Sequence, residues 1–453
     1  MSDFLVLLGI YVVLGTLIAV LVRRRRQSQE QYFLGGRMIG GLVSAGTYAA
    51  TTYSAFMMVG LVGLTYATGI GATLFELCYL AGTLILLATY GRRIWEMGRS
   101  KGLVSPMELF TQRYGRLTAG AGTVIALVAL IPYTASQVIG LGLIFQSHGA
   151  LSFTLGAAVA AVVIAVWALI GGLRGVAVTD TLQGAFMFAV AVAAVVWTRG
   201  RFPGLEPQSF PNAFWTPVRF VDLTLPWIFF ALTNPQVLQR LFIPRDGKAF
   251  NRMVWMFALF GLLYTLLVSF LGFSARWGTA QGLFPAVADR DRVILELLSR
   301  MRRGLSLALA LSIVFAAVTT ANSIILSLSS MVSRDLFPRQ HGLWLGRGLI
   351  GLLTALVFLF SLARPAYIVE LSVASSTILL CYLPLLFGLF HGRRGGELAG
   401  LLTLLTGAAA AILLAVLRVP LRSVYTLGVS FLAYFVGLGA ERLSAGRLAR
   451  RRR

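Results

Sequence analysis

The adjacent threonines Thr319 and Thr320 lie inside the strongly apolar run SIVFAAVTTANSIILSLSS, where hydroxyl groups need a physical reason. On a helix, side chains at positions i+3 and i+4 lie beside the backbone carbonyl of position i, which here belongs to Ala316. Two hydroxyls and one carbonyl would form a neutral site that suits a hard monovalent cation, and we interpret the pattern as a sodium site. The alternative is structural, because threonines in membrane helices also bond back to their own carbonyls or join neighbouring helices.

The elements that carry these threonines belong in a membrane. The chain has 453 residues, of which 58% are hydrophobic and 12% are charged, and its mean hydropathy is +0.82. Soluble globular domains have about a quarter of their residues charged. Apolar stretches long enough to cross a bilayer recur along the whole length, separated by short polar connections. The composition therefore predicts an all-α polytopic membrane protein in the cell membrane, with a single transmembrane domain.

We predict thirteen spans, with one orientation. Their approximate ranges are 3–22, 39–66, 73–91, 117–146, 152–172, 177–198, 226–243, 253–275, 304–333, 345–363, 367–390, 398–416 and 423–440. An odd number of spans places the two termini on opposite sides of the membrane. In polytopic membrane proteins the cytoplasmic connections carry the excess of positive charge. Most of the 39 lysines and arginines fall in connections on the same side of the membrane as the C-terminus. The N-terminus is therefore expected outside and the C-terminus inside.

The net charge of +23 does not indicate a nucleic-acid partner, because the basic residues are spread over many connections instead of one domain. Membrane topology and contacts with anionic lipids explain them better. The two cysteines and three histidines form no cluster at metal-ligand spacing, so neither an enzyme active site nor an organic cofactor is predicted. A channel would usually show a pore loop, whereas this chain has long repeats with two interrupted spans, so a channel is less favoured. A sensor would carry a soluble signalling domain, and no region of the sequence is predicted to form one.

Two of the spans are interrupted at matching places. The second contains small and hydroxyl residues from Ser44 to Ala55, and the seventh has Asn234 and Pro235 near its centre. Proline removes a backbone hydrogen bond, and unpaired backbone groups survive at membrane depth only beside a cavity, a partner or an ion. If the first span is set aside, the two interrupted spans are the first members of two successive sets of five spans. This order is typical of inverted-repeat transporters. Membrane helices also tolerate glycine and proline generally, which is the alternative.

This organisation divides the single domain into four parts. Residues 1–38 would form an extra helix and a cytoplasmic loop, and residues 39–198 the first five-helix repeat. The second repeat would cover 199–390, and two further helices with a basic tail would cover 391–453.

Several separated motifs resemble those of the sodium:solute symporter family. They are YFLGGR at 32–37, the following run SAGTYAATTYSAFMMVGLVGLTYATG, GGLRGVAVTDTLQG at 171–184, NPQVLQR at 234–240 and AAVTTANSIILSLSSMVSRDLF at 316–337. This family includes sodium-coupled carriers of proline, pantothenate, monocarboxylates and sugars. The resemblance implies the leucine-transporter fold of two inverted five-helix repeats, and sodium as the coupling ion. Thirteen spans with an outside N-terminus match the proline branch of the family.

The resemblance also implies the ligands of the ion. The backbone carbonyls of Ala50 and Tyr53, in the broken second span, would join the carbonyl of Ala316 and the hydroxyls of Thr319 and Thr320. This set of neutral oxygens needs no carboxylate.

The same resemblance suggests a solute pocket lined by the second, fourth, seventh and eleventh spans. The candidate residues are Thr52, Phe56, Tyr133, Ser136, Gln137 and Trp227. Thr52 stands where the proline symporter carries an aspartate, Phe56 replaces a tryptophan, and Ala231 replaces a tyrosine of the proline branch. These differences argue against proline itself. Aromatic residues in membrane helices also serve as packing residues or interface anchors, which is the alternative for each ring.

The charge pattern bears on the solute. The acids nearest the spans, Glu76, Asp180 and Glu370, lie towards span ends, and we interpret Asp180 and Arg174 as part of a cytoplasmic turn or gate. With no basic residue at mid-depth, an anion would be met by backbone N–H groups of the broken helices. The sequence therefore favours sodium-coupled import, by alternating access, of a small solute that carries a carboxylate. A sugar or polyol, and coupling to protons, remain alternatives, and the oligomeric state is not predicted.

Overall fold

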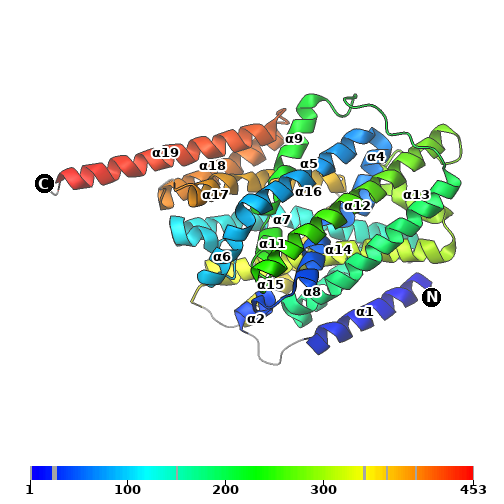
Figure 1. Cartoon of the computed structure of the whole chain (residues 1–453), viewed down its shortest axis with the longest axis horizontal. Coiled ribbons are helices and arrows are strands. Elements are labelled where there is room, and N and C mark those ends of the chain that lie inside the picture. The colour runs from blue at the N-terminus through cyan, green and yellow to red at the C-terminus, as the bar shows by residue number, and fades with distance from the viewer. Residues whose placement is uncertain are drawn as a thin grey trace.

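The computed structural model describes residues 3–22, 28–148, 151–339, 343–363, 366–392 and 395–451 (Figure 1). Within these ranges the regular elements are helices, together with one isolated backbone bridge between Ile39 and Pro244. Helices satisfy their own backbone hydrogen bonds, as a lipid environment requires.

The α-helices are α1 (Asp3–Val22), α2 (Gln29–Leu34), α3 (Gly41–Thr52), α4 (Val62–Thr68), α5 (Ile70–Leu86), α6 (Arg92–Ser100), α7 (Glu108–His148), α8 (Phe153–Arg201), α9 (Pro217–Ile228), α10 (Phe230–Thr233), α11 (Pro235–Arg240), α12 (Gly247–Ala280), α13 (Val293–Arg300), α14 (Arg303–Met331), α15 (Leu343–Ala363), α16 (Ile368–Leu379), α17 (Leu383–Phe390), α18 (Glu397–Val416) and α19 (Arg422–Arg451). The 3₁₀ and π segments are η1 (Gly35–Arg37), η2 (Phe56–Leu61), η3 (Leu87–Gly91), η4 (Arg290–Arg292), η5 (Val332–Leu336) and η6 (Leu380–Tyr382).

The number of helices able to cross a membrane can be compared with the thirteen expected spans. Among the described residues, 10 helices are long and apolar enough to cross, or 11 if the bent pair formed by α3 with η2 and α4 is one span. The remaining two expected spans, 3–22 and 226–243, correspond to α1 and to the short consecutive pieces at the end of α9, α10 and α11. The total of thirteen therefore remains a prediction.

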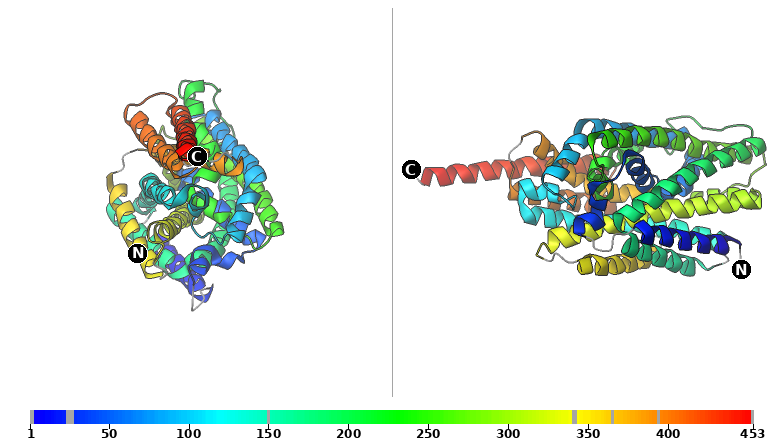
Figure 2. Two further views of the ribbon diagram at one scale, coloured as in Figure 1. Left: turned by 90° about the vertical axis from the view of Figure 1, so that its left-hand side faces the viewer. Right: turned by 60° about the horizontal axis from the view of Figure 1, so that its bottom comes forward.

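Most helices run along the long axis of one bundle, as Figure 1 shows. The start of α1 and the end of α19 lie at opposite ends of this bundle, and α19 extends beyond the other helices (Figure 2). This arrangement is compatible with termini on opposite sides of a membrane. Which side is cytoplasmic remains a prediction from the distribution of arginines.

The helix that carries the two threonines is the most enclosed of the candidate spans. In Arg303–Leu336 the apolar window is 94% buried, compared with 39% in Gly247–Ala280. Helix α14 packs against α8, α7 and α3, and the buried residues of its middle are largely small or hydroxyl-bearing. Small residues let neighbouring helix backbones approach closely. An apolar helix with hydroxyls is therefore at the centre of the protein, where it contacts the broken second span.

A backbone break inside α8 separates the fifth and sixth expected spans. Gly172 has φ +52° and ψ −173°, a conformation that side chains with a Cβ rarely adopt. The two candidate spans on either side are Phe153–Ile170 and Gly172–Arg201. The glycine pair in the GGLRG motif therefore marks the turn that the sequence places between these spans.

Candidate functional site

The second expected span is interrupted directly after α3. Tyr53 leaves the helical region with φ −89° and ψ 84°, and the chain resumes as η2 and α4 at an angle of 50°. A neighbouring helix satisfies part of the freed backbone, because the side-chain Oε1 of Gln137 on α7 accepts a hydrogen bond from the Ala55 N–H at 3.1 Å. The break is thus held open by a specific partner, as membrane interiors require.

The seventh expected span is divided between α9, α10 and α11. Asn234 has an extended backbone with φ −91° and ψ 111°, and Pro235 is the first residue of α11. Proline suits a first helical position because its missing N–H would have no partner there. The Asn234 side-chain Nδ2 lies 3.4 Å from the Ser376 hydroxyl on α16. The structure therefore places both break residues at the junction between two short helices.

The threonine pair on α14 contacts the end of α3, just before the first break. The Thr319 hydroxyl lies 3.0 Å from the Ala50 carbonyl oxygen and 3.1 Å from that of Ala316. The Thr320 hydroxyl lies 3.1 Å from the Ala50 carbonyl oxygen and 3.2 Å from that of Thr51. Both side chains are buried. The hydroxyls therefore do more than bond back to their own helix, because both reach the last turn of α3.

Four of the five expected ion ligands thus meet in one place. The described hydrogen bonds do not connect the fifth, the carbonyl of Tyr53, to either threonine, and the Thr51 carbonyl, which the sequence did not suggest, lies beside Thr320 instead. The Tyr53 ring packs against Phe257 at a centroid distance of 5.8 Å. Thr52, a candidate for ion or solute, donates its hydroxyl to the Tyr48 carbonyl within α3 at 2.8 Å.

A buried polar network continues from this cluster. The Thr51 and Ser323 hydroxyls are 2.8 Å apart, and Arg240 donates from Nη2 to the Ser323 hydroxyl at 2.6 Å. The Thr47 hydroxyl donates to Asp180 Oδ2 at 2.6 Å. Hydrogen bonds of this kind are what makes burial of charged groups tolerable in a low-dielectric interior. The network connects α3, α8, α11 and α14.

Two members of this network are more enclosed than the sequence predicts. Asp180 is expected in a cytoplasmic turn or gate, and Arg240 lies towards the end of the seventh expected span, yet their side chains are 1% and 0% exposed. The interior of the protein therefore contains a basic side chain that the sequence did not indicate. Position along the chain did not reveal that other helices cover the ends of α11 and of the preceding spans. The polar run of NPQVLQR, buried from 234 to 240, was the available signal.

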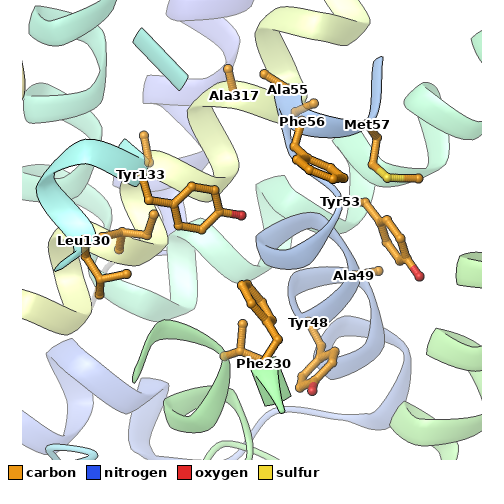
Figure 3. Packing of buried hydrophobic residues seen from close by; sticks show 14 of the residues in the cluster. Tyr48, Ala49, Tyr53, Ala55, Phe56, Met57, Leu130, Tyr133, Phe230 and Ala317 are labelled. Carbon is orange, nitrogen blue, oxygen red and sulfur yellow. The ribbon is translucent and has the colours of Figure 1, made fainter. Parts of the chain in front are cut away.

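The aromatic candidates gather beside the two breaks. The Trp227 ring lies 5.0 Å, between centroids, from the rings of both Phe56 and Phe230, and the Tyr133 ring lies 6.3 Å from that of Phe230. Figure 3 shows the rings of Phe56, Tyr133 and Phe230 directed towards one another from different elements. The structure therefore brings together Phe56, Tyr133 and Trp227, and adds Phe230, which the sequence analysis did not include.

Ser136 and Gln137 have local partners. The Ser136 hydroxyl donates to the Tyr133 carbonyl at 2.7 Å, and the Gln137 Nε2 donates to the Ser136 hydroxyl at 3.1 Å. With its Oε1 bound to the Ala55 N–H, Gln137 links α7 to the first break. Within the described contacts these two residues stabilise the walls of the site.

A buried glutamate completes this region. Glu76 on α5 is 2% exposed, and its Oε2 accepts a hydrogen bond from Trp227 Nε1 at 3.1 Å. Glu76 lies near the start of α5, as the sequence indicates, but its burial was not predicted. The helix α9 covers this part of α5, a long-range contact that the local sequence does not reveal. An ionisable residue inside an apolar span was itself a signal of a functional site.

Comparison with known proteins identifies the family. Residues 32–341 match the family model described as Sodium:solute symporter family. This chain belongs to the sodium:solute symporter family. The sodium/pantothenate symporter of Escherichia coli (strain K12) is 26% identical over 466 residues, covering 94% of each chain. The osmoregulated proline transporter OpuE of Bacillus subtilis (strain 168) is 23% identical, covering 91% of this chain and 88% of the relative.

Solved structures show the same fold. A substrate-bound, outward-open sodium-coupled sialic acid symporter aligns with a TM-score of 0.82 at 16% identity, covering 96% of this chain and 98% of the other. The crystal structure of MhsT in complex with L-phenylalanine aligns with a TM-score of 0.55 at 13% identity, covering 87% of this chain and 97% of the other. The expectation of a leucine-transporter-like fold is confirmed at this level.

The family assignment settles the class of the protein. It is a transporter and not an enzyme, and it is a multi-pass protein of the plasma membrane. Membership implies coupling to sodium and a small-molecule solute.

Proposed function

We propose that this chain imports a small organic solute together with sodium by alternating access. The observation that supports this best is the cluster in which Thr319 and Thr320 on α14 meet the Ala50 carbonyl at the end of α3. The cluster joins the first broken span to the central helix with neutral oxygen atoms only. A site of this composition suits a hard cation and can release it again, because no carboxylate holds the ion.

The hydroxyl chemistry indicates how the ion would act. A hydroxyl has one hydrogen to donate and two acceptor lone pairs. In the present arrangement the threonines donate to the carbonyls of Ala50, Thr51 and Ala316. A sodium ion at the centre would be coordinated by the hydroxyl lone pairs and by carbonyls, including that of Tyr53 by family resemblance. The ion would then hold α3 against α14, and its departure to the cytoplasm would let them separate.

The finer proposal is that the solute carries a carboxylate. Pantothenate and proline, the solutes named for two curated relatives, are both carboxylates. The aromatic residues beside the two breaks, Phe56, Tyr133 and Trp227, would enclose the apolar part of the solute. Broken helices expose backbone dipoles that favour an anionic group.

The test uses single substitutions Thr319→Ala and Thr320→Ala in the full chain, reconstituted into proteoliposomes. Losing one ligand should weaken the apparent sodium affinity at least about tenfold, equivalent to about 1.4 kcal/mol. The matched control is Thr354→Ala, because the buried Thr354 hydroxyl on α15 donates within its own helix, to Ile350 at 2.7 Å. Uptake of carboxylates, amino acids, pantothenate and sugars is measured with sodium and with potassium.

Three results would count against the proposal. Unchanged sodium dependence in both alanine variants would remove the ion site from these residues. Uptake driven by a pH gradient in the absence of sodium would favour proton coupling. Sodium-driven uptake of sugars or polyols, without uptake of any carboxylate, would replace the proposed class of solute.

A further inference from the structure

We propose that an anionic phospholipid binds in an apolar groove between α3, α8 and α12, with its phosphate beside Arg174, Lys248 and Arg252. We call these three side chains the basic rim. The inference goes beyond the proposed function, because it concerns a lipid of the membrane and neither the transported solute nor its ion.

The groove is a cavity of about 430 Å³ that opens to the outside of the bundle. Ala45, Gly46 and Ala49 line it on α3, which packs against both α8 and α12. Leu42 and Leu259, which also line it, are 55% and 61% exposed. Because an exposed apolar surface of this kind marks contact with a membrane or a partner, the groove is accessible to lipid.

The length of the groove fits an acyl chain. A second cavity of about 390 Å³ shares Phe188 and Leu263 with the first and is lined further along α12 by Phe270. From Met256 to Phe270 the helix rises about 21 Å, at about 1.5 Å per residue. One leaflet of the hydrocarbon core is about 15 Å thick, so the two cavities together can take a complete acyl chain.

The basic rim lies at one end of this groove. On α12, Lys248 and Arg252 come two turns and one turn before Met256, which lines the groove. On α8, Arg174 comes two turns before Thr181, which also lines it. Residues at these spacings share one face of a helix, so the rim lies on the same helix faces as the groove.

The segment that leads into α3 touches both sides of the rim. A Cβ at Gly35 would lie 3.6 Å from the Cβ of Arg174, and a Cβ at Gly41 would lie 2.8 Å from the Cβ of Arg252. The positive charges of α8 and α12 are therefore gathered around the start of α3.

The basic rim has no acidic partner within the part of the chain that the structure describes. Its three side chains are exposed, and none of them forms an ion pair there. Asp246, the acid nearest to Lys248 and Arg252 in the sequence, pairs with Arg245 and caps α12. Basic pockets between transmembrane helices bind anionic headgroups. The rim would hold the phosphate while an acyl chain lies in the groove.

The same charge argues against a second copy of this chain as the occupant. The net charge of the chain is +23, and a second copy would bring further positive charge to the rim. An anionic lipid brings the opposite charge, and its chain matches the apolar lining.

The groove lies behind the helix that carries the sodium cluster. Ala45 and Ala49 line the groove on α3, and the next residue, Ala50, offers its carbonyl to Thr319 and Thr320. A bound acyl chain would therefore support α3 in the position where it meets α14. This consequence rests on the proposed function, whereas the lipid site does not. By linkage, lipid and sodium should strengthen each other's binding by the same factor.

The test compares lipids that differ only in the headgroup. Thermal unfolding of the purified full chain in detergent is followed with dioleoylphosphatidylglycerol, which is anionic, and with dioleoylphosphatidylcholine, which is zwitterionic. Phosphatidylglycerol should raise Tm more, and glycerol phosphate, which has no acyl chain, should not raise it. Equal effects of the two lipids, no effect of either, or equal stabilisation by glycerol phosphate would overturn the proposal.

The variant Gly184→Leu fills the groove. Gly184 lines it, and a Cβ there has no heavy atom within 4 Å, so the leucine side chain enters the space assigned to the lipid. The stabilisation specific to phosphatidylglycerol should disappear. The control is Gly351→Leu on α15, an exposed position that also meets open space and does not line the groove. Preserved stabilisation in Gly184→Leu, or equal loss in both variants, would overturn the proposal.

A second variant covers the case in which Gly184→Leu does not fold. Arg252→Gln changes an exposed side chain and leaves the groove intact. The apparent affinity for phosphatidylglycerol should fall roughly fivefold, as expected for one basic residue at an anionic headgroup. The control is Arg442→Gln, which removes an exposed basic side chain from α19. An unchanged affinity in Arg252→Gln, or the same loss in the control, would contradict the basic rim.

Two further measurements separate the lipid site from other readings. Light scattering that shows a wild-type dimer and a monomeric Gly184→Leu variant, with no preference for phosphatidylglycerol, would assign the groove to a second copy and overturn the proposal. In a sodium titration, phosphatidylglycerol should raise the apparent sodium affinity at least about fivefold over phosphatidylcholine. Stabilisation by phosphatidylglycerol without this change would support the lipid site and contradict its link to the sodium cluster.

Uptake into proteoliposomes distinguishes this proposal from the proposed function. Sodium-driven uptake together with equal stabilisation by both lipids would contradict the lipid site and leave sodium symport intact. Stabilisation specific to phosphatidylglycerol without sodium-driven uptake would support the lipid site and contradict symport.

Discussion

At the scale of single residues, Gln137 is the contact on which the shape of the first break depends most directly. Its Oε1 accepts from the N–H of Ala55, the residue at which the helix resumes after the break. Replacing Gln137 with leucine would leave that buried donor without an acceptor, at a cost of about 1–3 kcal/mol. We expect the variant to unfold at lower temperature and to bind sodium more weakly, because the break sits beside the ion cluster. Thermal unfolding over a sodium titration measures both effects.

The comparison for this variant is Gln183→Leu. Gln183 is also a buried glutamine, and it donates to the Tyr11 hydroxyl at 2.6 Å, between α8 and α1. This variant should lose stability while the apparent sodium affinity stays at the wild-type value. If both variants change sodium affinity equally, Gln137 has no special part in shaping the break.

The sequence revealed some of these residues and concealed others for a physical reason. Thr319, Thr320 and Ala316 belong to one helical turn, so their meeting follows from local periodicity. The roles of Glu76 and Arg240 depend on which distant helices cover them, and neither composition nor spacing contains that information. The Ala50 carbonyl was expected from the family resemblance, and local helical periodicity alone did not indicate it.

At the scale of elements, the close approach of α3 and α8 keeps the broken span in place. Gly46 on α3 lies against Thr181 on α8, and a Cβ at Gly46 would collide with the Thr181 side chain. Replacing Gly46 with alanine should push the helices apart and destabilise the protein by about 1–3 kcal/mol. Thermal unfolding and sodium-dependent uptake are the measurements, and both should decline.

Gly184 on α8 offers the matched substitution. A Cβ at Gly184 has no heavy atom within 4 Å, so Gly184→Ala meets open space. It should keep or raise stability, because alanine favours a helix over glycine by roughly 1 kcal/mol. Equal behaviour of the two alanine variants would mean that the contact between α3 and α8 does not limit stability.

The elements show which parts of the fold the sequence can predict. Apolar length located most spans, since a helix must cross about 30 Å of hydrocarbon. Pro235 located the break in the seventh span, because proline acts on the backbone directly, and the small and hydroxyl residues from Ser44 to Ala55 located the break in the second span. The arrangement of α9, α10 and α11 as three short pieces was not predicted, since it depends on contacts with α5 and α16.

At the scale of the whole molecule, the segment between α12 and α14 is fastened to the start of α16. The Asp291 Oδ2 accepts from the Ile368 N–H at 3.1 Å, and the neighbouring Arg290 forms an ion pair with Glu370. Burial raises the pKa of Asp291 from 3.8 to about 6, because the charged carboxylate is poorly solvated there.

This raised pKa gives a pH dependence with a definite sign. The folded protein binds the Asp291 proton more tightly than the unfolded chain does, so this contribution to stability is full below pH 3.8 and declines as pH rises through about 6. In Asp291→Asn that decline should disappear. The decrease in Tm between about pH 4.5 and pH 7 should therefore be smaller in the variant than in the wild type. Identical decreases, with Glu296→Gln as the reference, would contradict this assignment.

The neutral composition of the sodium cluster has an electrical consequence for the proposed symport. The threonine hydroxyls and the Ala50 carbonyl carry no charge, so a sodium ion bound there would cross with its whole positive charge. A bare monocarboxylate that enters with one sodium ion moves no net charge, and the membrane voltage then contributes nothing to its uptake. A zwitterion or a sugar crosses as a neutral molecule, so each accompanying sodium would move one positive charge inward. That charge is worth about 2.3 kcal/mol per 100 mV, or roughly 50-fold more solute retained inside the cell. The charge of the solute would thus decide whether the transport cycle generates an electric current.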